Sequence, residues 1–124
     1  MSKTASITIF IITILILGGG LFLATKKNPA VGNLDDFAKC LTSKGMTMYG
    51  AYWCPHCLNI KKLFADSFQY IQYVECTVSV KTCTDQNVSG YPTFIFSDGT
   101  RLEGEVGLSD FAQKTSCTLP QPGH

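Results

Sequence analysis

The sequence lacks an excess of charge of either sign. Its 124 residues carry 10 basic and 9 acidic side chains, which gives a formal net charge of +1, and only 15% of the residues are charged. A protein that binds nucleic acid or an anionic surface electrostatically presents a concentrated basic patch, and this balanced chain has no surplus to form one. We therefore expect no nucleic-acid partner.

The chain also lacks the length for two ordinary domains, and it contains neither an internal repeat nor a low-complexity segment. Hydrophobic residues make up 45% of it, which excludes a disordered chain. Its 6 cysteines fall short of the density of a small scaffold held together by disulfides alone. The composition therefore predicts one compact domain with a hydrophobic core.

Charged residues are missing altogether from residues 4–25. As a helix this stretch is about 33 Å long, which matches the roughly 30 Å hydrocarbon core of a bilayer. A cleaved signal peptide is the alternative, but its apolar region is shorter and no Ala-x-Ala cleavage site follows here. No nearby cysteine is available for a lipid. We expect residues 1–27 to form an N-terminal transmembrane anchor and residues 28–33 to form a linker.

The number of cysteines, rather than the charge flanking the expected anchor, indicates on which side of the membrane the rest of the chain lies. Lys3 on one side of the span is nearly balanced by Lys26 and Lys27 on the other. Six cysteines in so short a chain indicate an oxidising compartment, because disulfides persist mainly outside the cytoplasm. We expect the remainder of the chain to be extracytoplasmic, in the periplasm or at the cell exterior.

After the linker, apolar spacing predicts alternating helices and strands. Asn33 is expected to cap a helix of about ten residues that stops at Gly45, and residues 46–53 are expected to form a buried strand. The remaining expected elements are a helix after Cys54, a strand over residues 70–75, an irregular stretch between Cys76 and Cys83, a strand over residues 94–96, a return strand from Arg101 and a short helix capped by Ser109.

Cys54, Pro55, His56 and Cys57 stand where the strand gives way to a helix. A helix N-terminus carries partial positive charge and unpaired N–H groups, which favour the thiolate of the first cysteine. Cys54 is therefore expected to be the exposed attacking sulfur, and Cys57 the buried partner that resolves a mixed disulfide. Pro55 fixes φ in the first turn without losing a needed donor, and His56 is expected to place a donor or positive charge near the Cys54 sulfur.

A structural zinc site is the alternative use of Cys54 and Cys57. It would need two further ligands, for which the candidates are Cys76, Cys83 and His56. A Pro-His dipeptide between the cysteines is more typical of a redox site, so we expect no metal and no bound cofactor.

The strand, the Cys-x-x-Cys motif and a later Pro-Thr pair together resemble the thioredoxin-fold thiol–disulfide oxidoreductases. Residues 53–57 stand at the active-site position of that family, and Tyr91, Pro92 and Thr93 stand at its cis-proline loop. The segments 48–57, 73–76 and 90–93 are most similar to the thioredoxin-like domain fused to bacterial vitamin K epoxide reductase homologues.

The resemblance implies a thioredoxin-like α/β fold over residues 34–117, followed by a flexible tail over residues 118–124. The first strand of the full fold is absent, so we expect a trimmed sheet of about four strands flanked by helices. The resemblance also implies that Trp53, Tyr91 and Pro92 form the substrate-binding surface. The chain departs from the family at Met48, where ordinary thioredoxins have a buried Asp that helps to move protons to and from the second cysteine.

The other four cysteines are expected to be structural. Similar domains carry a cysteine pair in the region of Cys76 and Cys83, and the resemblance implies a disulfide between them, across a loop short enough for the usual Cα separation of about 5.5–6 Å. Cys40 and Cys117 would then pair by elimination. Their helices could instead cover different faces of the sheet, which leaves this second bond open.

The resemblance implies an enzyme that exchanges disulfides with protein thiols. The Pro-His dipeptide resembles that of the bacterial oxidant DsbA, which favours net oxidation of secreted thiols, with a separate membrane quinone reductase as the redox partner. A reductive role, such as keeping haem-attachment cysteines reduced, is one alternative. A non-catalytic zinc-binding or interaction module tethered to the membrane is the other.

Overall fold

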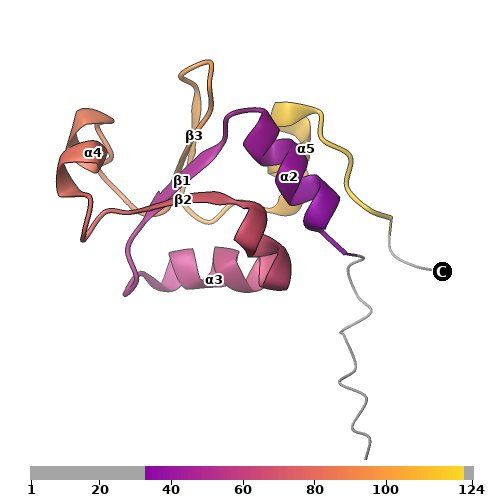
Figure 1. The fold of residues 1–124 in the computed structure, drawn as a ribbon, viewed down its shortest axis with the longest axis horizontal. Helices are drawn as coiled ribbons and strands as arrows, with labels where there is room; N and C mark the ends of the chain where they lie inside the picture. Colours follow the sequence, from indigo (N-terminus) through magenta and orange to yellow (C-terminus); the bar gives the residue numbers. More distant parts are fainter. Residues whose placement is uncertain (1–32, 122–124) are drawn as a thin grey trace, which may run out of the picture.

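A computed structural model describes residues 33–121 of the chain, which form a four-stranded sheet with helices on both faces (Figure 1). The elements in chain order are α2 (Asp35–Ser43), β1 (Thr47–Gly50), α3 (Pro55–Phe64), the 3-10 helix η1 (Ala65–Tyr70), β2 (Gln72–Glu75), α4 (Val80–Asp85), β3 (Thr93–Ile95), β4 (Arg101–Glu103) and α5 (Leu108–Thr115). The expected N-terminal anchor lies outside the described residues. No helix within residues 33–121 has the length and apolar character needed to cross a bilayer.

β1 lies in the interior of the sheet, whose strand order is β2-β1-β3-β4. It runs parallel to β2 and antiparallel to β3, and β3 pairs antiparallel with β4. The parallel pair needs a crossover connection, which α3 and η1 supply. The prediction of a trimmed thioredoxin-like sheet of about four strands flanked by helices is therefore confirmed.

The two faces of the sheet have separate cores, because neighbouring residues of a strand point to opposite faces. Met48 of β1 and Phe94 of β3 belong to the larger core, to which α2, α3 and α5 all contribute. Its largest fully buried side chains are Phe37, Phe64, Phe94, Phe111, Leu41, Met46, Met48 and Ile60. Tyr49 and Ile95 belong to a smaller cluster on the other side, which is completed by Cys76 and Cys83 next to α4. Figure 1 accordingly shows α4 at the opposite end of the molecule from α2 and α5.

Two disulfides join parts of this framework. Cys76 is bonded to Cys83, with a Cα–Cα distance of 5.7 Å, and Cys40 is bonded to Cys117, with a Cα–Cα distance of 5.9 Å. The second pair can form because α2 and the chain after α5 pack into the same core, rather than onto different faces of the sheet. All four cysteines outside the Cys-x-x-Cys motif are thus oxidised in the structure.

Several elements differ in extent from the sequence-based expectation. β1 ends at Gly50 rather than at residue 53, because the Cys54 N–H bonds to the Ala51 carbonyl at 3.1 Å and closes a turn. η1 ends at Tyr70, where the second strand was expected to begin, and β2 starts at Gln72. The stretch between Cys76 and Cys83, expected to be irregular, contains the start of α4.

The helix ends also differ in detail. The N-cap of α2 is Leu34 rather than Asn33, which lies one residue further out and accepts the Asp35 N–H with its Oδ1 at 2.8 Å. α5 starts after Gly107 instead of Ser109, and the Gly107 N–H donates to the Asp110 carboxylate at 2.8 Å. Leu119, in the segment predicted to be a tail, packs against the larger core.

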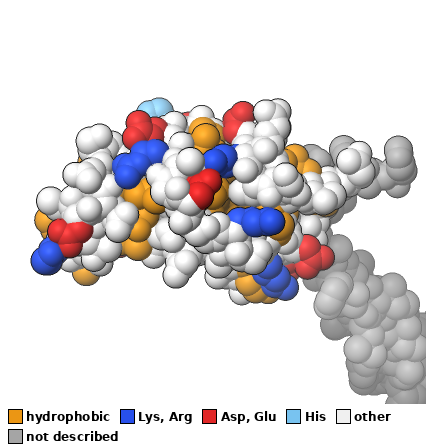
Figure 2. Space-filling model, turned by 90° about the horizontal axis from the view of Figure 1, so that it is seen from above, with side chains coloured by type: hydrophobic (Ala, Val, Ile, Leu, Met, Phe, Trp, Pro, Cys, Tyr) orange, Lys and Arg blue, Asp and Glu red, His pale blue; other side chains and the backbone are white. Residues whose placement is uncertain are grey.

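Basic and acidic side chains are interspersed on the face drawn in Figure 2, with apolar side chains between them. Neither sign of charge forms a continuous patch on this face. This side of the described domain therefore offers no concentrated charge for a polyanion to bind.

Candidate active site

Cys54 occupies the N-cap position of α3, and Pro55 is the first residue of the helix. The Cys54 sulfur accepts the backbone N–H of Cys57 at 3.4 Å, so it satisfies one of the N–H groups left free at the start of a helix. The first turn of α3 contains no acidic residue to oppose a negative sulfur. The local sequence therefore places Cys54 where a thiolate is stabilised by the helix dipole.

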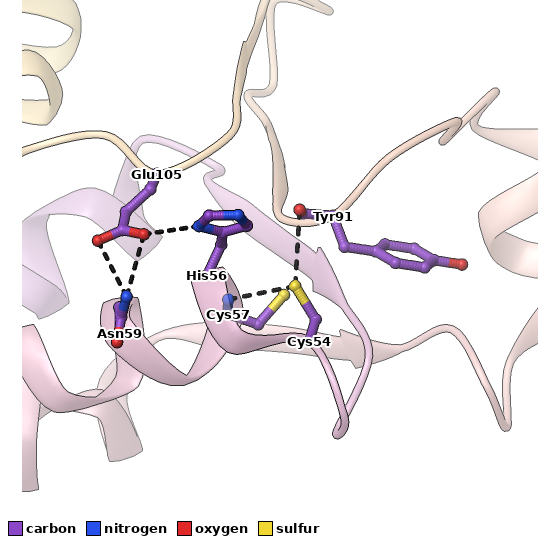
Figure 3. Close-up of polar contacts among 6 residues, drawn as sticks. All are labelled: Cys54, His56, Cys57, Asn59, Tyr91 and Glu105. Atoms are coloured by element: carbon purple, nitrogen blue, oxygen red, sulfur yellow. Dashed lines mark hydrogen bonds and ion pairs between the residues drawn. The ribbon is translucent and has the colours of Figure 1, made fainter.

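Both active-site cysteines are free thiols and both are buried. The expectation of an exposed Cys54 is wrong for this structure, since the residue is only 4% exposed, against 0% for Cys57. The Tyr91 carbonyl oxygen lies 3.6 Å from Cys54 Sγ and covers it from the opposite loop, as Figure 3 shows. Sequence reasoning missed this cover because the two residues are far apart along the chain.

The loop opposite Cys54 has the geometry expected of it. The Tyr91–Pro92 peptide bond is cis, Pro92 is fully buried, and the Pro92 carbonyl accepts the Gly104 N–H at 2.8 Å. The Tyr91 ring meets the Trp53 indole edge-on, with a centroid distance of 6.0 Å. Trp53 remains 59% exposed. The structure thus brings Trp53 and Tyr91 together beside Cys54, whereas Pro92, the third residue expected to face a substrate, is buried.

His56 contacts Glu105. It was expected instead to place a donor or positive charge near the Cys54 sulfur. Its Nδ1 lies 2.8 Å from Glu105 Oε2, and Asn59 donates to both oxygens of the same carboxylate at 3.2 and 3.1 Å (Figure 3). The hydrogen bond from His56, followed by that from Asn59, holds the pKa of Glu105 below its ordinary value. Glu105 could not be found from sequence, because only the tertiary fold brings the chain after β4 to the start of α3.

Cys57 points toward β1 at Gly50. A methyl group placed on Gly50 would lie 3.0 Å from Cys57 Sγ, closer than such contacts normally are. Burial, followed by the hydrogen bond with Cys54, raises the pKa of the Cys57 thiol to about 11. A glycine inside a strand is a recognised sign of close approach by another group, and it is the signal that could have marked this position.

Tyr73 and Glu75 of β2 form a hydrogen-bonded pair, and Tyr73 Oη lies near Gly50 as Cys57 Sγ does. Tyr73 Oη donates to Glu75 Oε2 at 2.7 Å, while Glu75 Oε1 accepts from the Tyr52 N–H at 3.2 Å and from Thr77 Oγ1 at 2.8 Å. Burial and the Glu75 hydrogen bond raise the pKa of Tyr73. Burial also acts to raise the pKa of Glu75, but the bonds from Tyr73, Thr77 and Tyr52 outweigh it and lower that pKa.

The described residues do not assemble a zinc site around the motif. Cys76 and Cys83, which would have completed such a site, are bonded to each other. Among residues 33–121, no group of three or more His, Cys, Asp or Glu side chains is arranged to hold a metal ion.

Comparisons with known proteins agree with this geometry. The chain is 40% identical over 93 residues to the thiol-disulfide oxidoreductase LTO1 of Arabidopsis thaliana, and 31% identical over 88 residues to the thioredoxin domain-containing protein 5 homolog of Drosophila melanogaster. These alignments cover 68% and 63% of this chain, but only 24% and 21% of the two relatives. The chain therefore spans about a quarter of the length of these curated relatives.

Among solved structures, the first thioredoxin domain of mouse protein disulfide-isomerase A4 is similar, with a TM-score of 0.41 and 20% sequence identity over 73% of this chain and 76% of that chain. The sequence profile of the family described as thioredoxin matches residues 31–115. That match covers the four strands and the Cys-Pro-His-Cys motif at the start of α3. The chain therefore belongs to the thioredoxin family.

Proposed function

We propose that the chain is a thiol–disulfide oxidoreductase that exchanges disulfides with protein substrates through Cys54 and Cys57. The observation that carries this proposal is the position of Cys54 Sγ at the N-cap of α3, in hydrogen-bond contact with the N–H of Cys57. A sulfur held there is a good leaving group and a good nucleophile, and Cys57 is close enough to close a disulfide with it.

In the oxidising direction, a substrate thiolate attacks Cys54 Sγ of the Cys54–Cys57 disulfide. The bond between the two protein sulfurs breaks, the electron pair leaves on Cys57 Sγ, and that sulfur takes up a proton. A second substrate thiolate then attacks the substrate sulfur of the mixed disulfide and releases the Cys54 thiolate. Two electrons pass from the substrate to the protein, and no cofactor is needed.

Trp53 and Tyr91 are proposed to hold the substrate. Their rings meet edge-on beside Cys54, and Trp53 presents an exposed apolar surface. In the reduced protein the Cys54 thiol donates to the Tyr91 carbonyl at 3.6 Å, so a substrate disulfide that approaches Cys54 must displace that contact or move the loop. Because the Tyr91 loop covers Cys54, we expect small-molecule thiols and peptides that bind Trp53 and Tyr91 to react at different rates.

Net oxidation is the direction that we propose. The helix start favours the reduced form, because it stabilises a Cys54 thiolate that the disulfide lacks. Burial, followed by the hydrogen bond with Cys54, raises the pKa of Cys57 to about 11, so the buried sulfur keeps its proton at neutral pH. A membrane quinone reductase, of the type to which similar thioredoxin-like domains are fused, is the proposed re-oxidant.

We further propose that the domain acts outside the cytoplasm and is anchored by the uncharged segment of residues 4–25. Support comes from the Cys76–Cys83 and Cys40–Cys117 bonds, because structural disulfides of this kind persist in oxidising compartments.

The test is the reduction potential of the Cys54–Cys57 pair in the detergent-solubilised full chain. The protein is equilibrated with glutathione buffers, and alkylation followed by peptide mapping separates this pair from the other cysteines. A potential nearer to the roughly −120 mV of DsbA than to the roughly −270 mV of thioredoxin is expected. A value near that of thioredoxin would favour the reductive role. Stoichiometric zinc that is lost in Cys54→Ser would overturn the enzyme proposal.

A further inference from the structure

The proposed exchange reaction moves a proton on or off Cys57 in every turnover, and the following inference rests on that reaction. The Cys57 sulfur is 0% exposed, so solvent cannot supply or remove the proton directly. Met48, two residues before Gly50 in β1, and Ala51, directly after that strand, are buried and have no titratable side chain. A group from another element must therefore serve this sulfur.

Tyr73 Oη approaches the same position as the sulfur, from β2. The two strands are parallel, and their register pairs Met48 with Tyr73 and Gly50 with Glu75. A methyl group on Gly50 would lie 3.0 Å from Cys57 Sγ and 3.3 Å from Tyr73 Oη. The sulfur and the phenol oxygen thus converge on a position of β1 that carries no side chain.

Glu75 fixes the direction of the Tyr73 hydroxyl. Its Oε1 is held by Thr77 Oγ1 and by the Tyr52 N–H, which leaves Oε2 to accept the Tyr73 proton at 2.7 Å. A phenol has one proton, and here it is directed at the carboxylate, so the remaining lone pairs of Tyr73 Oη are available to a thiol. Glu75 is also only partly buried, which connects this pair with solvent.

Lys61 of α3 packs against the Tyr73 ring. It lies one helical turn after Cys57, and its Nζ is 4.0 Å from the centre of the Tyr73 ring. The titratable groups that act on Cys57 are therefore Cys54 and Lys61, while Tyr73 and its hydrogen-bond partner Glu75 approach from β2. The Lys61 charge favours the thiolate, while Cys54 opposes it.

We propose that Tyr73, oriented by Glu75, carries the proton of Cys57 between the buried sulfur and solvent. When the Cys54–Cys57 bond breaks, the electron pair leaves on Cys57 Sγ. Glu75, after taking up a solvent proton, donates it to Tyr73 Oη, and the tyrosine's own proton, released from the carboxylate, passes to Cys57 Sγ. In the reverse direction, the Cys57 thiol gives its proton to Tyr73 Oη as the tyrosine proton moves to Glu75. No oxidant or reductant beyond the exchanging disulfide takes part.

The test compares Tyr73→Phe with a matched control, Tyr70→Phe, in the full-length protein. Tyr73→Phe keeps the ring that packs against Phe68 and Lys61 and removes only the hydroxyl. Tyr70 also carries a lysine over its ring, Lys39 at 4.4 Å, but it lies in η1 and serves neither sulfur. The readout is the single-turnover rate at which the oxidised protein reacts with a two-cysteine peptide, measured by acid quench from about pH 5 to about pH 9.

Tyr73→Phe is expected to slow this step by about ten-fold or more, because positioned acids and bases typically contribute larger factors than that. The deficit should be largest above neutral pH, where solvent protons are scarce, whereas a packing defect would lower the rate equally at every pH. Glu75→Gln, which leaves the hydroxyl in place, should show the same pH trend with a smaller loss. Tyr70→Phe should react as the unaltered protein does.

An unchanged rate and pH profile in Tyr73→Phe would overturn the inference while leaving the oxidoreductase proposal intact. An equal loss in Tyr70→Phe would overturn it as well, since the effect would then be general packing. A Glu75→Gln protein that matches the unaltered protein would remove the orienting role of Glu75. If the unaltered protein formed no mixed disulfide at all, the proposed function itself would fail.

Discussion

His56 Nδ1 lies 2.8 Å from Glu105 Oε2, so the histidine between the active-site cysteines is held by a carboxylate from the chain after β4. The structure therefore gives the start of α3 two opposing influences on the Cys54 thiolate. His56 follows Cys54 by two residues and can carry positive charge at the start of α3, while the Glu105 carboxylate that binds it adds negative charge there.

Substitution of each partner should shift the reduction potential in opposite directions. His56→Ala removes a group that favours the thiolate, so the pair should become more reducing. One pKa unit of thiolate stabilisation corresponds to about 1.4 kcal/mol, or about 30 mV, and because His56 is exposed we expect on the order of 10–30 mV. Glu105→Gln should make the pair more oxidising. Glutathione equilibration measures both, and a shift of the same sign in the two variants would contradict this account.

Cys54 should form the mixed disulfide with substrate, and Cys57 should resolve it. Cys57→Ser is therefore expected to accumulate a covalent complex with substrate proteins, while Cys54→Ser accumulates none. The reason is that Cys57 is fully buried and its pKa is raised to about 11, so it is a thiol at neutral pH. Non-reducing electrophoresis detects the complexes. Complexes that form through Cys57 in the absence of Cys54 would reverse the two roles.

The reduced domain should lose stability in alkali through Cys57. Its folded pKa of about 11 lies above the ordinary value of 9.0, so the folded state holds the proton more tightly than the unfolded state. The resulting stabilisation is complete below about pH 9 and is lost as the pH rises toward about 11. Urea unfolding of the reduced protein at both pH values measures this loss. Cys57→Ser is the control, and an equal loss in that variant would assign the effect to other groups.

The two structural disulfides should differ in their contribution to stability. In the chain-entropy model the Cys76–Cys83 bond, with a sequence separation of 7, contributes about 2.4 kcal/mol, and the Cys40–Cys117 bond, with a separation of 77, about 4.5 kcal/mol. Denaturant unfolding of the paired alanine variants measures the two losses. A larger loss from removal of the Cys76–Cys83 bond would show that local geometry at α4 outweighs loop entropy.

Gly50→Ala should disturb the active site although residue 50 takes no part in the chemistry. The new methyl group would lie 3.0 Å from Cys57 Sγ and 3.1 Å from Tyr73 Cε2, so these side chains must move. Overpacking of this kind costs about 1–3 kcal/mol of stability. Gly90→Ala is the matched control, because nothing lies within 4 Å of a methyl group at that position. Thermal unfolding and the exchange rate are the measurements, and equal behaviour of the two variants would refute the close-contact argument.

Local patterns predicted the parts of the site that depend on neighbouring residues. The strand and the cysteine at the helix start could be read from the sequence, because spacing and backbone chemistry determine them, and the Pro92 loop followed from the resemblance to thioredoxin-fold oxidoreductases. The cover over Cys54 and the His56–Glu105 contact could not, since both need loops from distant parts of the chain to meet. The Tyr73–Glu75 group needs the register of β1 against β2, and a single sequence does not define register.

Glu75 connects the end of β2, next to the Cys76–Cys83 disulfide, with the loop that precedes Cys54. It immediately precedes Cys76, so the Cys76–Cys83 bond fixes the strand end from which its carboxylate reaches the Tyr52 N–H in the active-site loop. The Cys76 N–H also donates to the Gly50 carbonyl at 2.8 Å, so the disulfide and the pairing of β1 with β2 hold this strand end together. The surroundings of the reactive sulfurs therefore rest in part on a disulfide that lies outside the Cys-x-x-Cys motif.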